Sequence, residues 1–271
     1  MSERRKVTVP AVAARKGDGQ PLVMVTVYDS LFAELVDEAG VDLILVGDSV
    51  GTVIQGRRNT LAVTMEQMEY HVGMVASVRP RALVVGDMPF GSYHESNEQA
   101  VRSAVRLVQA GAECVKLEGG SRVADRIAAI VRADIPVMGH VGLTPQSFHR
   151  MGGHRIQGRT HGEDASAAGS VIEDAHCVDQ SGAFALVIEG VPAVLGRDIT
   201  EKVSVPTIGI GAGPGCDGQV LVLHDILGLT KRQPSFARSW TDGRRLVADA
   251  VGGYAAGVRE RRWPDPDHVT A

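Results

Sequence analysis

The chain has 271 residues, of which 44% are hydrophobic, 22% charged and 4% aromatic, and its formal net charge is −4. This apolar fraction excludes a disordered chain, and an acidic total without a long basic run argues against nucleic acid as a partner. Three cysteines do not form the even set of a disulfide scaffold, and there is neither a signal-peptide pattern nor a run of about 18 apolar residues. We therefore expect a cytoplasmic protein with no membrane partner.

Short runs rich in Val, Ile and Leu recur along the chain, separated by segments with helical spacing. Continuous apolar runs are typical of parallel strands that are buried on both faces. The expected strands are Pro21–Thr26, Asp42–Val46, Ala82–Val85, Cys114–Leu117, Pro136–Gly139, Ala185–Ile188, Pro206–Ile210 and Gln219–Leu223. Their alternation with helices predicts a (β/α)8 TIM barrel. We expect one domain over residues 1–271, with a polar N-terminal segment at 1–20 and an exposed tail at 259–271.

Several helix boundaries are visible in the sequence. Asp29 and Asn97 are expected N-caps, because each precedes a segment with helical spacing. Gly40 and Gly111 follow such segments and are expected helix ends.

Two connections do not fit a plain alternation of strands and helices. The connection from 139 to 185 is too long for one loop and one helix, whereas the connection from 210 to 219 leaves room for only a turn or a short helix. Within the first, the stretch Met151–Gly162 is rich in Gly, His and Arg, which predicts a lid over the site.

Polar side chains stand at the ends of the first six predicted strands. They are Tyr28 and Asp29, then Asp48 and Ser49, then Asp87, then Lys116 and Glu118, then His140, and finally Glu189. In a barrel these strand ends converge on the face where the chemistry is found. Four carboxylates in one small mouth repel one another unless a cation lies between them. Asp48, Asp87 and Glu118 are hard oxygen ligands, so Mg²⁺ is the expected metal.

Each of these residues also has an ordinary structural interpretation. A single Asp after a strand is more often the N-cap of the next helix, and we assign Asp29 to that role. Four carboxylates at equivalent strand ends favour a shared site instead. Lys116 and Glu118 are two residues apart and so point to the same side of the strand. For His140, a ligand, a substrate contact and a hydrogen-bonded core histidine stay open.

A glycine-rich stretch, Gly209-Ile210-Gly211-Ala212-Gly213, follows the seventh predicted strand. Barrels often bind phosphate near strands seven and eight through backbone N–H groups. However, this stretch matches neither the dinucleotide nor the P-loop fingerprint. A tight turn that allows close approach of a neighbouring segment is at least as good an interpretation.

Several ordered motifs resemble one known family. They are Val46-Gly47-Asp48-Ser49, Asp87-Met88-Pro89-Phe90, Val115-Lys116-Leu117-Glu118-Gly119-Gly120, Gly139-His140-Val141-Gly142-Leu143-Thr144-Pro145-Gln146, Ile188-Glu189-Gly190-Val191-Pro192, Ile208-Gly209-Ile210-Gly211-Ala212-Gly213 and Asp217-Gly218-Gln219. Together, over roughly residues 10 to 240, they are similar to the ketopantoate hydroxymethyltransferase (3-methyl-2-oxobutanoate hydroxymethyltransferase) family. Each motif alone is unspecific, whereas the ordered set is specific.

The resemblance implies transfer of a hydroxymethyl group from 5,10-methylenetetrahydrofolate to 3-methyl-2-oxobutanoate, giving 2-dehydropantoate in pantothenate biosynthesis by Mg²⁺-stabilised enolate chemistry. It also implies one Mg²⁺ per subunit and a homodecamer, a pentamer of dimers. The implied roles are Asp48, Asp87 and Glu118 for the metal, Asp48, Ser49, Asp87, Lys116, His140 and Tyr28 for the substrate, and Glu189 as the catalytic base.

Two alternatives stay open. One is a Mg²⁺-dependent enolate C–C lyase of the isocitrate lyase or phosphonopyruvate type, which uses a reactive cysteine in a mobile loop. The expected lid, Met151–Gly162, contains no cysteine. The other is a non-catalytic barrel, which the loss of a strand-end carboxylate would indicate, and here all four are present.

Overall fold

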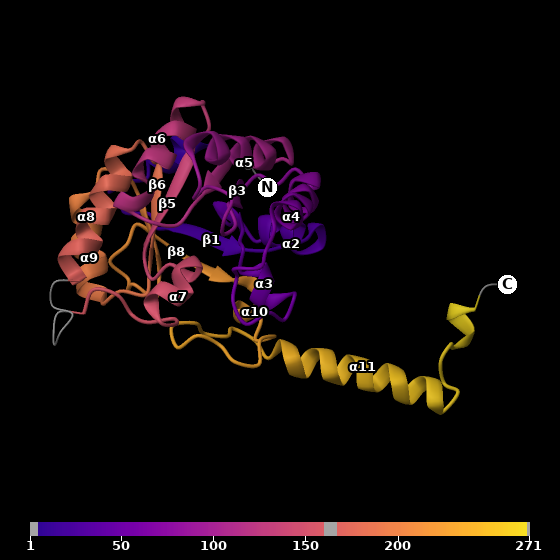
Figure 1. Cartoon of the computed structure of the whole chain (residues 1–271). Helices are drawn as coiled ribbons and strands as arrows, with labels where there is room; N and C mark the ends of the chain where they lie inside the picture. Colours follow the sequence, from indigo (N-terminus) through magenta and orange to yellow (C-terminus); the bar gives the residue numbers. More distant parts are fainter. Residues whose placement is uncertain (1–4, 160–166, 270–271) are drawn as a thin grey trace. The chain divides into compact units, whose positions relative to one another are not determined.

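The computed structural model describes residues 5–159 and 167–269. Within these residues, eight parallel strands form a closed barrel in chain order (Figure 1). The strands are β1 (Leu22–Thr26), β2 (Leu43–Val46), β3 (Leu83–Asp87), β4 (Cys114–Lys116), β5 (Val137–Gly142), β6 (Ala185–Glu189), β7 (Thr207–Ile210) and β8 (Gly218–Val222). Each expected segment overlaps one of these strands, so the predicted (β/α)8 TIM barrel is confirmed.

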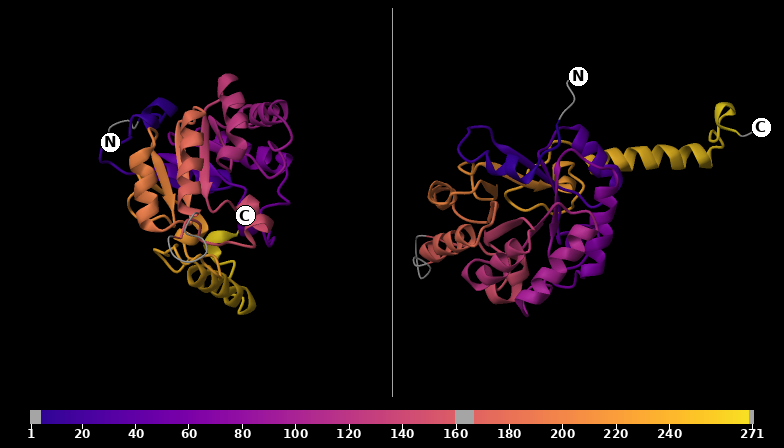
Figure 2. Two further views of the ribbon diagram at one scale, coloured as in Figure 1. Left: turned by 60° about the vertical axis from the view of Figure 1, so that its left-hand side comes forward. Right: turned by 90° about the horizontal axis from the view of Figure 1, so that it is seen from above.

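The chain forms two compact units, one up to Leu221 and one from Val222 onward. The helical segments of the first are α1 (Val9–Ala13), α2 (Ser30–Glu38), α3 (Val50–Val53), α4 (Met65–Ser77), α5 (Asn97–Gln109), η1 (Ser121–Val123), α6 (Ala124–Arg132), η2 (Pro145–Ser147), α7 (Phe148–Met151), α8 (Ala167–Gln180) and α9 (Ala193–Lys202). Those of the second are α10 (Leu223–Ile226), α11 (Gly243–Arg259) and η3 (Pro266–His268). Both views in Figure 2 show the purple, magenta and orange helices around the strands. The predicted domain extent over residues 1–271 stays a prediction.

The core inside the barrel consists of side chains that alternate along the strands. Leu43 and Leu45 of β2 and Leu83 and Val85 of β3 belong to one buried cluster, which also contains Val12 of α1. Successive side chains of a strand point to opposite faces, and the residues between these are buried as well. β2 and β3 are therefore covered on both faces, as their continuous apolar runs predict, whereas Val23 of β1 is 49% exposed.

Most of the predicted helix boundaries are confirmed. The Asp29 carboxylate accepts a hydrogen bond from the backbone N–H of Phe32 at 2.9 Å, and Gly40 and Gly111 follow their helices with φ of 94° and 114°. The prediction for Asn97 is wrong by one residue. Ser96 is the N-cap of α5, because its backbone is extended and its hydroxyl accepts from the third N–H of the helix.

The two unusual connections differ in their secondary structure. The one between β5 and β6 contains η2, α7 and α8, and residues 160–162 of the expected lid lie outside the described residues. Residues 211–217, between β7 and β8, contain no helix. There, a Cβ on Gly213 would lie 2.4 Å from the Cβ of Ala193 in α9. This geometry supports a tight turn with close approach of a helix rather than a phosphate site.

In the described part of the chain, no helix combines the length and the hydropathy that are needed to cross a membrane.

Candidate active site

The carboxyl ends of β2 to β6 bring the predicted site residues together at one end of the barrel. Parallel pairing places Asp87 of β3 beside Lys116 of β4, and Gly142 of β5 beside Glu189 of β6. The buried polar or charged residues at this end are Asp48, Asp87, Lys116, Glu118, His140 and Gln146, each with an exposed fraction of 5% or less. A cluster of ionisable groups this deeply buried is costly unless its members pair with one another or with a ligand.

Asp48, Asp87 and Lys116 form the first part of the cluster. The Lys116 ammonium donates to Oδ1 of Asp87 at 2.7 Å, and the backbone N–H of Asp48 donates to Oδ2 of Asp87 at 3.1 Å. Burial, followed by the negative charges of Asp87 and Glu118, raises the pKa of Asp48 well above its ordinary value. Burial also raises the pKa of Asp87, although Lys116 opposes this effect. The site therefore holds more negative charge than Lys116 alone neutralises.

Glu118, His140 and Glu189 form the second part. The imidazole of His140 lies between the two carboxylates, with Nδ1 3.6 Å from Oε1 of Glu118 and Nε2 3.2 Å from Oε2 of Glu189. These are ion-pair contacts rather than well-aligned hydrogen bonds. Burial lowers the pKa of His140, but the two carboxylates outweigh this effect and raise it to about 9. The imidazole of His140 therefore lies within the site, and its role as a substrate contact stays a prediction.

The sequence led us to expect His140 directly after the fifth strand, but the structure places it within that strand. β5 extends to Gly142, and His140 pairs with Val187 of β6 inside the ladder. The strand is longer than predicted because Gly139 and Gly142 interrupt the apolar run without interrupting the hydrogen bonding.

The sequence-based prediction missed Gln146 and Tyr93. The Gln146 side-chain amide donates to Oδ2 of Asp48 at 3.0 Å and to the carbonyl of Met88 at 2.9 Å, while its backbone N–H donates to Oε2 of Glu118 at 2.9 Å. The Tyr93 hydroxyl donates to Oε1 of Gln146 at 2.6 Å. Gln146 thus orients two carboxylates at once. Its place at the end of the motif Gly139–Gln146 is the one sequence signal that pointed to it.

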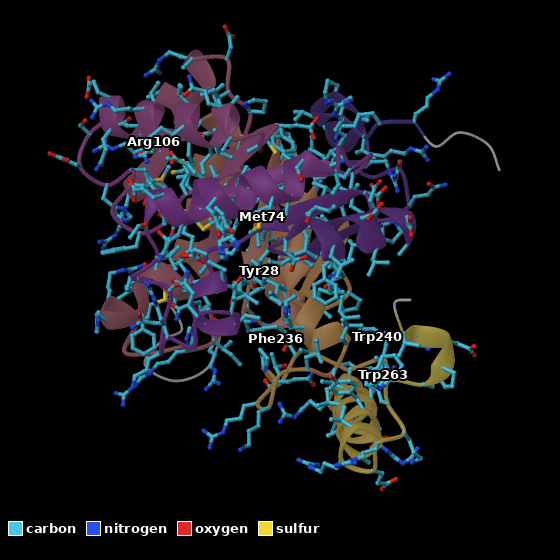
Figure 3. All side chains as sticks on the ribbon, turned by 90° about the vertical axis from the view of Figure 1, so that its right-hand side faces the viewer. Tyr28, Met74, Arg106, Phe236, Trp240 and Trp263 are labelled. Atoms are coloured by element: carbon cyan, nitrogen blue, oxygen red, sulfur yellow. The ribbon has the colours of Figure 1, made fainter. Side chains whose placement is uncertain are left out.

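Tyr28 and Ser49 form a separate pair near this cluster. Tyr28, labelled in Figure 3, is buried, and its hydroxyl lies 2.8 Å from the hydroxyl of Ser49. Ser49 follows Asp48 in the chain and precedes α3. The contact with Ser49 therefore ties the Tyr28 hydroxyl to the residue that directly follows Asp48.

The residues fit a divalent cation only in part. Within the described residues, no three His, Cys, Asp or Glu side chains are arranged to hold a metal together. Asp48 and Asp87 are adjacent buried carboxylates, which suits Mg²⁺ because this ion keeps several water molecules and binds through one or two carboxylates plus substrate oxygens. Glu118 instead contacts His140, Lys116 and the backbone N–H of Gln146.

A cavity of about 660 Å³ adjoins the cluster, and Glu118, Gln146 and Tyr93 are among the residues that line it. It lies between the segments that follow β3, β4 and β5 and the first turns of α8. The cluster thus has open space beside it that is large enough for a drug-sized ligand.

A closed (β/α)8 barrel with buried carboxylates, a lysine and a histidine at the carboxyl ends of its strands has the architecture of a barrel enzyme. The sequence profile described as ketopantoate hydroxymethyltransferase matches residues 6–266. The chain belongs to this family, and it is an enzyme.

Curated relatives carry the same family name. The 3-methyl-2-oxobutanoate hydroxymethyltransferase of Ignicoccus hospitalis is 53% identical over 260 residues, which cover 96% of this chain and 97% of that protein. The enzyme of the same name from Geobacter metallireducens is 51% identical over 97% of this chain and 98% of its own length.

Two solved structures that resemble this chain share its fold at low sequence identity. Phosphonopyruvate hydrolase in complex with oxalate and Mg²⁺ has a TM-score of 0.63 at 12% identity, covering 97% of this chain and 91% of that one. The 2,3-dimethylmalate lyase, a member of the PEP mutase/isocitrate lyase superfamily, has a TM-score of 0.58 at 15% identity, covering 98% and 91%.

Proposed function

We propose that this enzyme transfers a hydroxymethyl group from 5,10-methylenetetrahydrofolate to 3-methyl-2-oxobutanoate, giving 2-dehydropantoate for pantothenate biosynthesis. The observation that carries the proposal is the contact chain from Asp48 and Asp87 through Lys116 and Glu118 to His140 and Glu189, in a chain of this family. It places an acidic pair, a cation and a candidate base at one end of one barrel.

Asp48 and Asp87 would hold Mg²⁺, with Glu118 completing the site through water. When bound there, Mg²⁺ supplies Lewis-acid polarisation of the keto acid's carbonyl, which makes the neighbouring C–H more acidic. The excess negative charge of the cluster supports a cation at this position, since the pKa of Asp48 is raised by burial and by its acidic neighbours.

Lys116 holds the substrate side of the site. Its ammonium is buried and donates to Oδ1 of Asp87, so it lies directly beside one of the two proposed metal ligands. Burial lowers the pKa of Lys116, but Asp87, Glu118 and Asp48 outweigh this and raise it, so the side chain is cationic at neutral pH. A permanent cation there attracts the carboxylate of a keto acid. The hydroxyls of Tyr28 and Ser49 supply further polar contacts.

Glu189 acts as the base in this proposal. Its side chain is 13% exposed, so it reaches the open end of the barrel while remaining in contact with His140. It removes the proton from C3 of the keto acid, and the resulting carbon nucleophile attacks the methylene carbon of the donor. The new C–C bond forms, and both C–N bonds of the methylene bridge break. Water supplies the hydroxyl group, and the C3 proton and the remaining proton of water end on N5 and N10 of tetrahydrofolate. His140 Nε2 lies 3.2 Å from Oε2 of Glu189 and helps to position this carboxylate.

The test is a transfer assay with the purified protein, Mg²⁺, 5,10-methylenetetrahydrofolate and 3-methyl-2-oxobutanoate, followed by mass spectrometry of the product. We expect 2-dehydropantoate to form in amounts equal to the tetrahydrofolate released. Cleavage of a 2-alkylmalate or a phosphonopyruvate with no transfer would establish the lyase alternative instead. No turnover in either assay would favour a non-catalytic barrel.

For the oligomer we propose a homodecamer, a pentamer of dimers. Support comes from the second unit, where α11 carries an apolar stripe at spacings of four, three and four residues, Val247, Val251, Tyr254 and Val258, each at least 44% exposed. Light scattering after gel filtration tests the subunit number.

A cytoplasmic location agrees with the three cysteines, which are free thiols.

A further inference from the structure

The side-chain amide of Gln146 has one orientation that satisfies all of its partners. Its Nε2 donates to Oδ2 of Asp48 at 3.0 Å and to the carbonyl of Met88 at 2.9 Å. Its Oε1 accepts from the Tyr93 hydroxyl at 2.6 Å. If the amide turned over, Oε1 would face the Asp48 carboxylate and the Met88 carbonyl, and neither of these has a proton to donate. The three contacts therefore fix which end of the amide faces Asp48.

Tyr93 supplies the one donor among these three contacts. Its side chain is buried, and its ring stacks on that of His94 with centroids 4.2 Å apart. A phenol has one proton to donate, and the 2.6 Å contact with Gln146 is shorter than the 3.1 Å contact with the carbonyl of Glu118. The hydroxyl oxygen also accepts from the backbone N–H of Glu118 at 3.2 Å. Tyr93 thus joins the amide of Gln146 to the backbone of the segment that follows β4.

The amide of Gln146 in turn holds the carboxylate of Asp48. Within residues 5–159 and 167–269, Gln146 is the one residue that hydrogen-bonds to this carboxylate, and it does so at Oδ2. Asp87 is held at both of its carboxylate oxygens, by the Lys116 ammonium at 2.7 Å and by the backbone N–H of Asp48 at 3.1 Å. The protein therefore sets the orientation of both proposed metal ligands before a metal binds.

A carboxylate of fixed orientation can discriminate between divalent cations. Mg²⁺ requires near-ideal octahedral geometry and keeps several water molecules, whereas Ca²⁺ takes about six to eight oxygen ligands and accepts bidentate carboxylates. An Asp48 that is held at Oδ2 is restricted to presenting Oδ1, which suits Mg²⁺. An Asp48 that turns freely can present both oxygens, which suits Ca²⁺. The contact from Gln146 therefore favours the smaller ion.

We propose that Tyr93 is a positioning residue of the metal site, which fixes the amide of Gln146 and thereby holds Asp48 in the orientation that selects Mg²⁺ over Ca²⁺. The metal's place at Asp48 and Asp87 rests on the proposed function. Tyr93 acts through Gln146 and not as a ligand, because its hydroxyl already donates to the amide and accepts from the Glu118 backbone. Mg²⁺ is the smaller ion and the stronger Lewis acid, so this selection serves the polarisation of the keto acid's carbonyl.

The test is calorimetric titration of the metal-free protein with Mg²⁺ and, separately, with Ca²⁺, in the absence of both substrates. Tyr93→Phe removes the hydroxyl and keeps the ring that stacks on His94. We expect it to weaken Mg²⁺ binding about 10-fold and to leave Ca²⁺ binding within about 2-fold of the wild type. A general loss of structure would instead weaken both ions together. Tyr70→Phe, on α4 and 67% exposed, removes a hydroxyl outside the site and should match the wild type.

A double-mutant cycle tests whether Tyr93 acts through Gln146. Gln146→Leu should lower the Mg²⁺/Ca²⁺ affinity ratio by about the same factor of 10. The variant that carries both substitutions should fall no further than Gln146→Leu alone, because the hydroxyl then has no amide to orient. Additive effects would overturn this route. Circular dichroism and melting temperature establish that each variant is folded. If Tyr93→Phe is not, Gln146→Leu replaces it, and an unchanged ratio there overturns the proposal.

This proposal and the proposed function can fail separately. An unchanged affinity ratio in Tyr93→Phe would overturn the positioning role and leave the proposed function standing. Because metal binding is measured without substrates, a fall in the ratio supports the positioning role even if the wild type transfers no one-carbon unit. A wild type that binds Ca²⁺ as tightly as Mg²⁺ would also overturn the positioning role, since there would be no selection for Tyr93 to maintain.

Discussion

Replacing Gln146 with leucine removes the side chain that joins Asp48, Met88 and Tyr93, with little change in volume. The hydrogen bond to the Asp48 carboxylate is worth about 1.5–3 kcal/mol, and each of the two neutral bonds about 0.5–1.5 kcal/mol. Leucine satisfies none of the three partners, all of which are buried. The substitution leaves no large cavity, so the loss of stability comes from the three hydrogen bonds. We expect Gln146→Leu to lower the free energy of unfolding by about 3–5 kcal/mol.

The assay is urea unfolding of the metal-free protein at pH 7, followed by circular dichroism. Gln109→Leu is the matched control, because Gln109 is the exposed last residue of α5, and it should change stability by no more than about 0.5 kcal/mol. A loss of less than about 1 kcal/mol in Gln146→Leu would refute the network, since three buried partners cannot lose their bonds at so small a cost.

Three further predictions concern the carboxylates. Glu189→Gln should slow deuterium exchange at C3 of the keto acid by about 100-fold or more in an NMR assay, while keto acid binding persists; normal exchange would remove Glu189 from the role of base. Asp48→Ala and Asp87→Ala should each weaken Mg²⁺ binding in calorimetry, and unchanged affinity in both would exclude this metal site. The pKa of Asp48 in the folded state is raised above its ordinary value of 3.8, so this residue makes the metal-free protein less stable as pH rises. An asparagine cannot ionise. Asp48→Asn should therefore stabilise the metal-free protein at pH 7 and reduce the fall in melting temperature above pH 4. An equal fall in melting temperature above pH 4 in Asp48→Asn and in the wild type would contradict this account.

The fold could be predicted from local patterns because apolar runs alternate with segments of helical spacing, and polar residues mark the ends of the first six predicted strands. The same pattern located Asp48, Asp87 and Glu189, since a strand end is defined by its own few residues. The position of Asn97 was wrong by one because Ser96 and Asn97 are both good N-caps, and only the extended backbone of Ser96 distinguishes them.

Gln146 and Tyr93 could not be predicted in the same way. Gln146 contacts residues that are 28 to 98 positions away in the sequence, and Tyr93 reaches Gln146 across 53 positions. Nothing in the sequence around a glutamine indicates that its side-chain amide will be buried against the carboxylate of Asp48 and the carbonyl of Met88. That information arises only when the barrel closes and brings the segments after β2, β4 and β5 to one end.

The position of His140 inside β5 has a consequence for how this enzyme tolerates insertions. Side chains alternate along a strand, so a shift of one residue would put Gly139, which has no side chain, or Val141 in place of the imidazole between Glu118 and Glu189. An added residue before Val137 therefore removes the histidine from the reaction centre. By contrast, length changes between Gln146 and β6 leave the spacing of the ionisable groups and the contacts of Gln146 intact, and that part of the chain is where natural or designed variants have freedom to diverge.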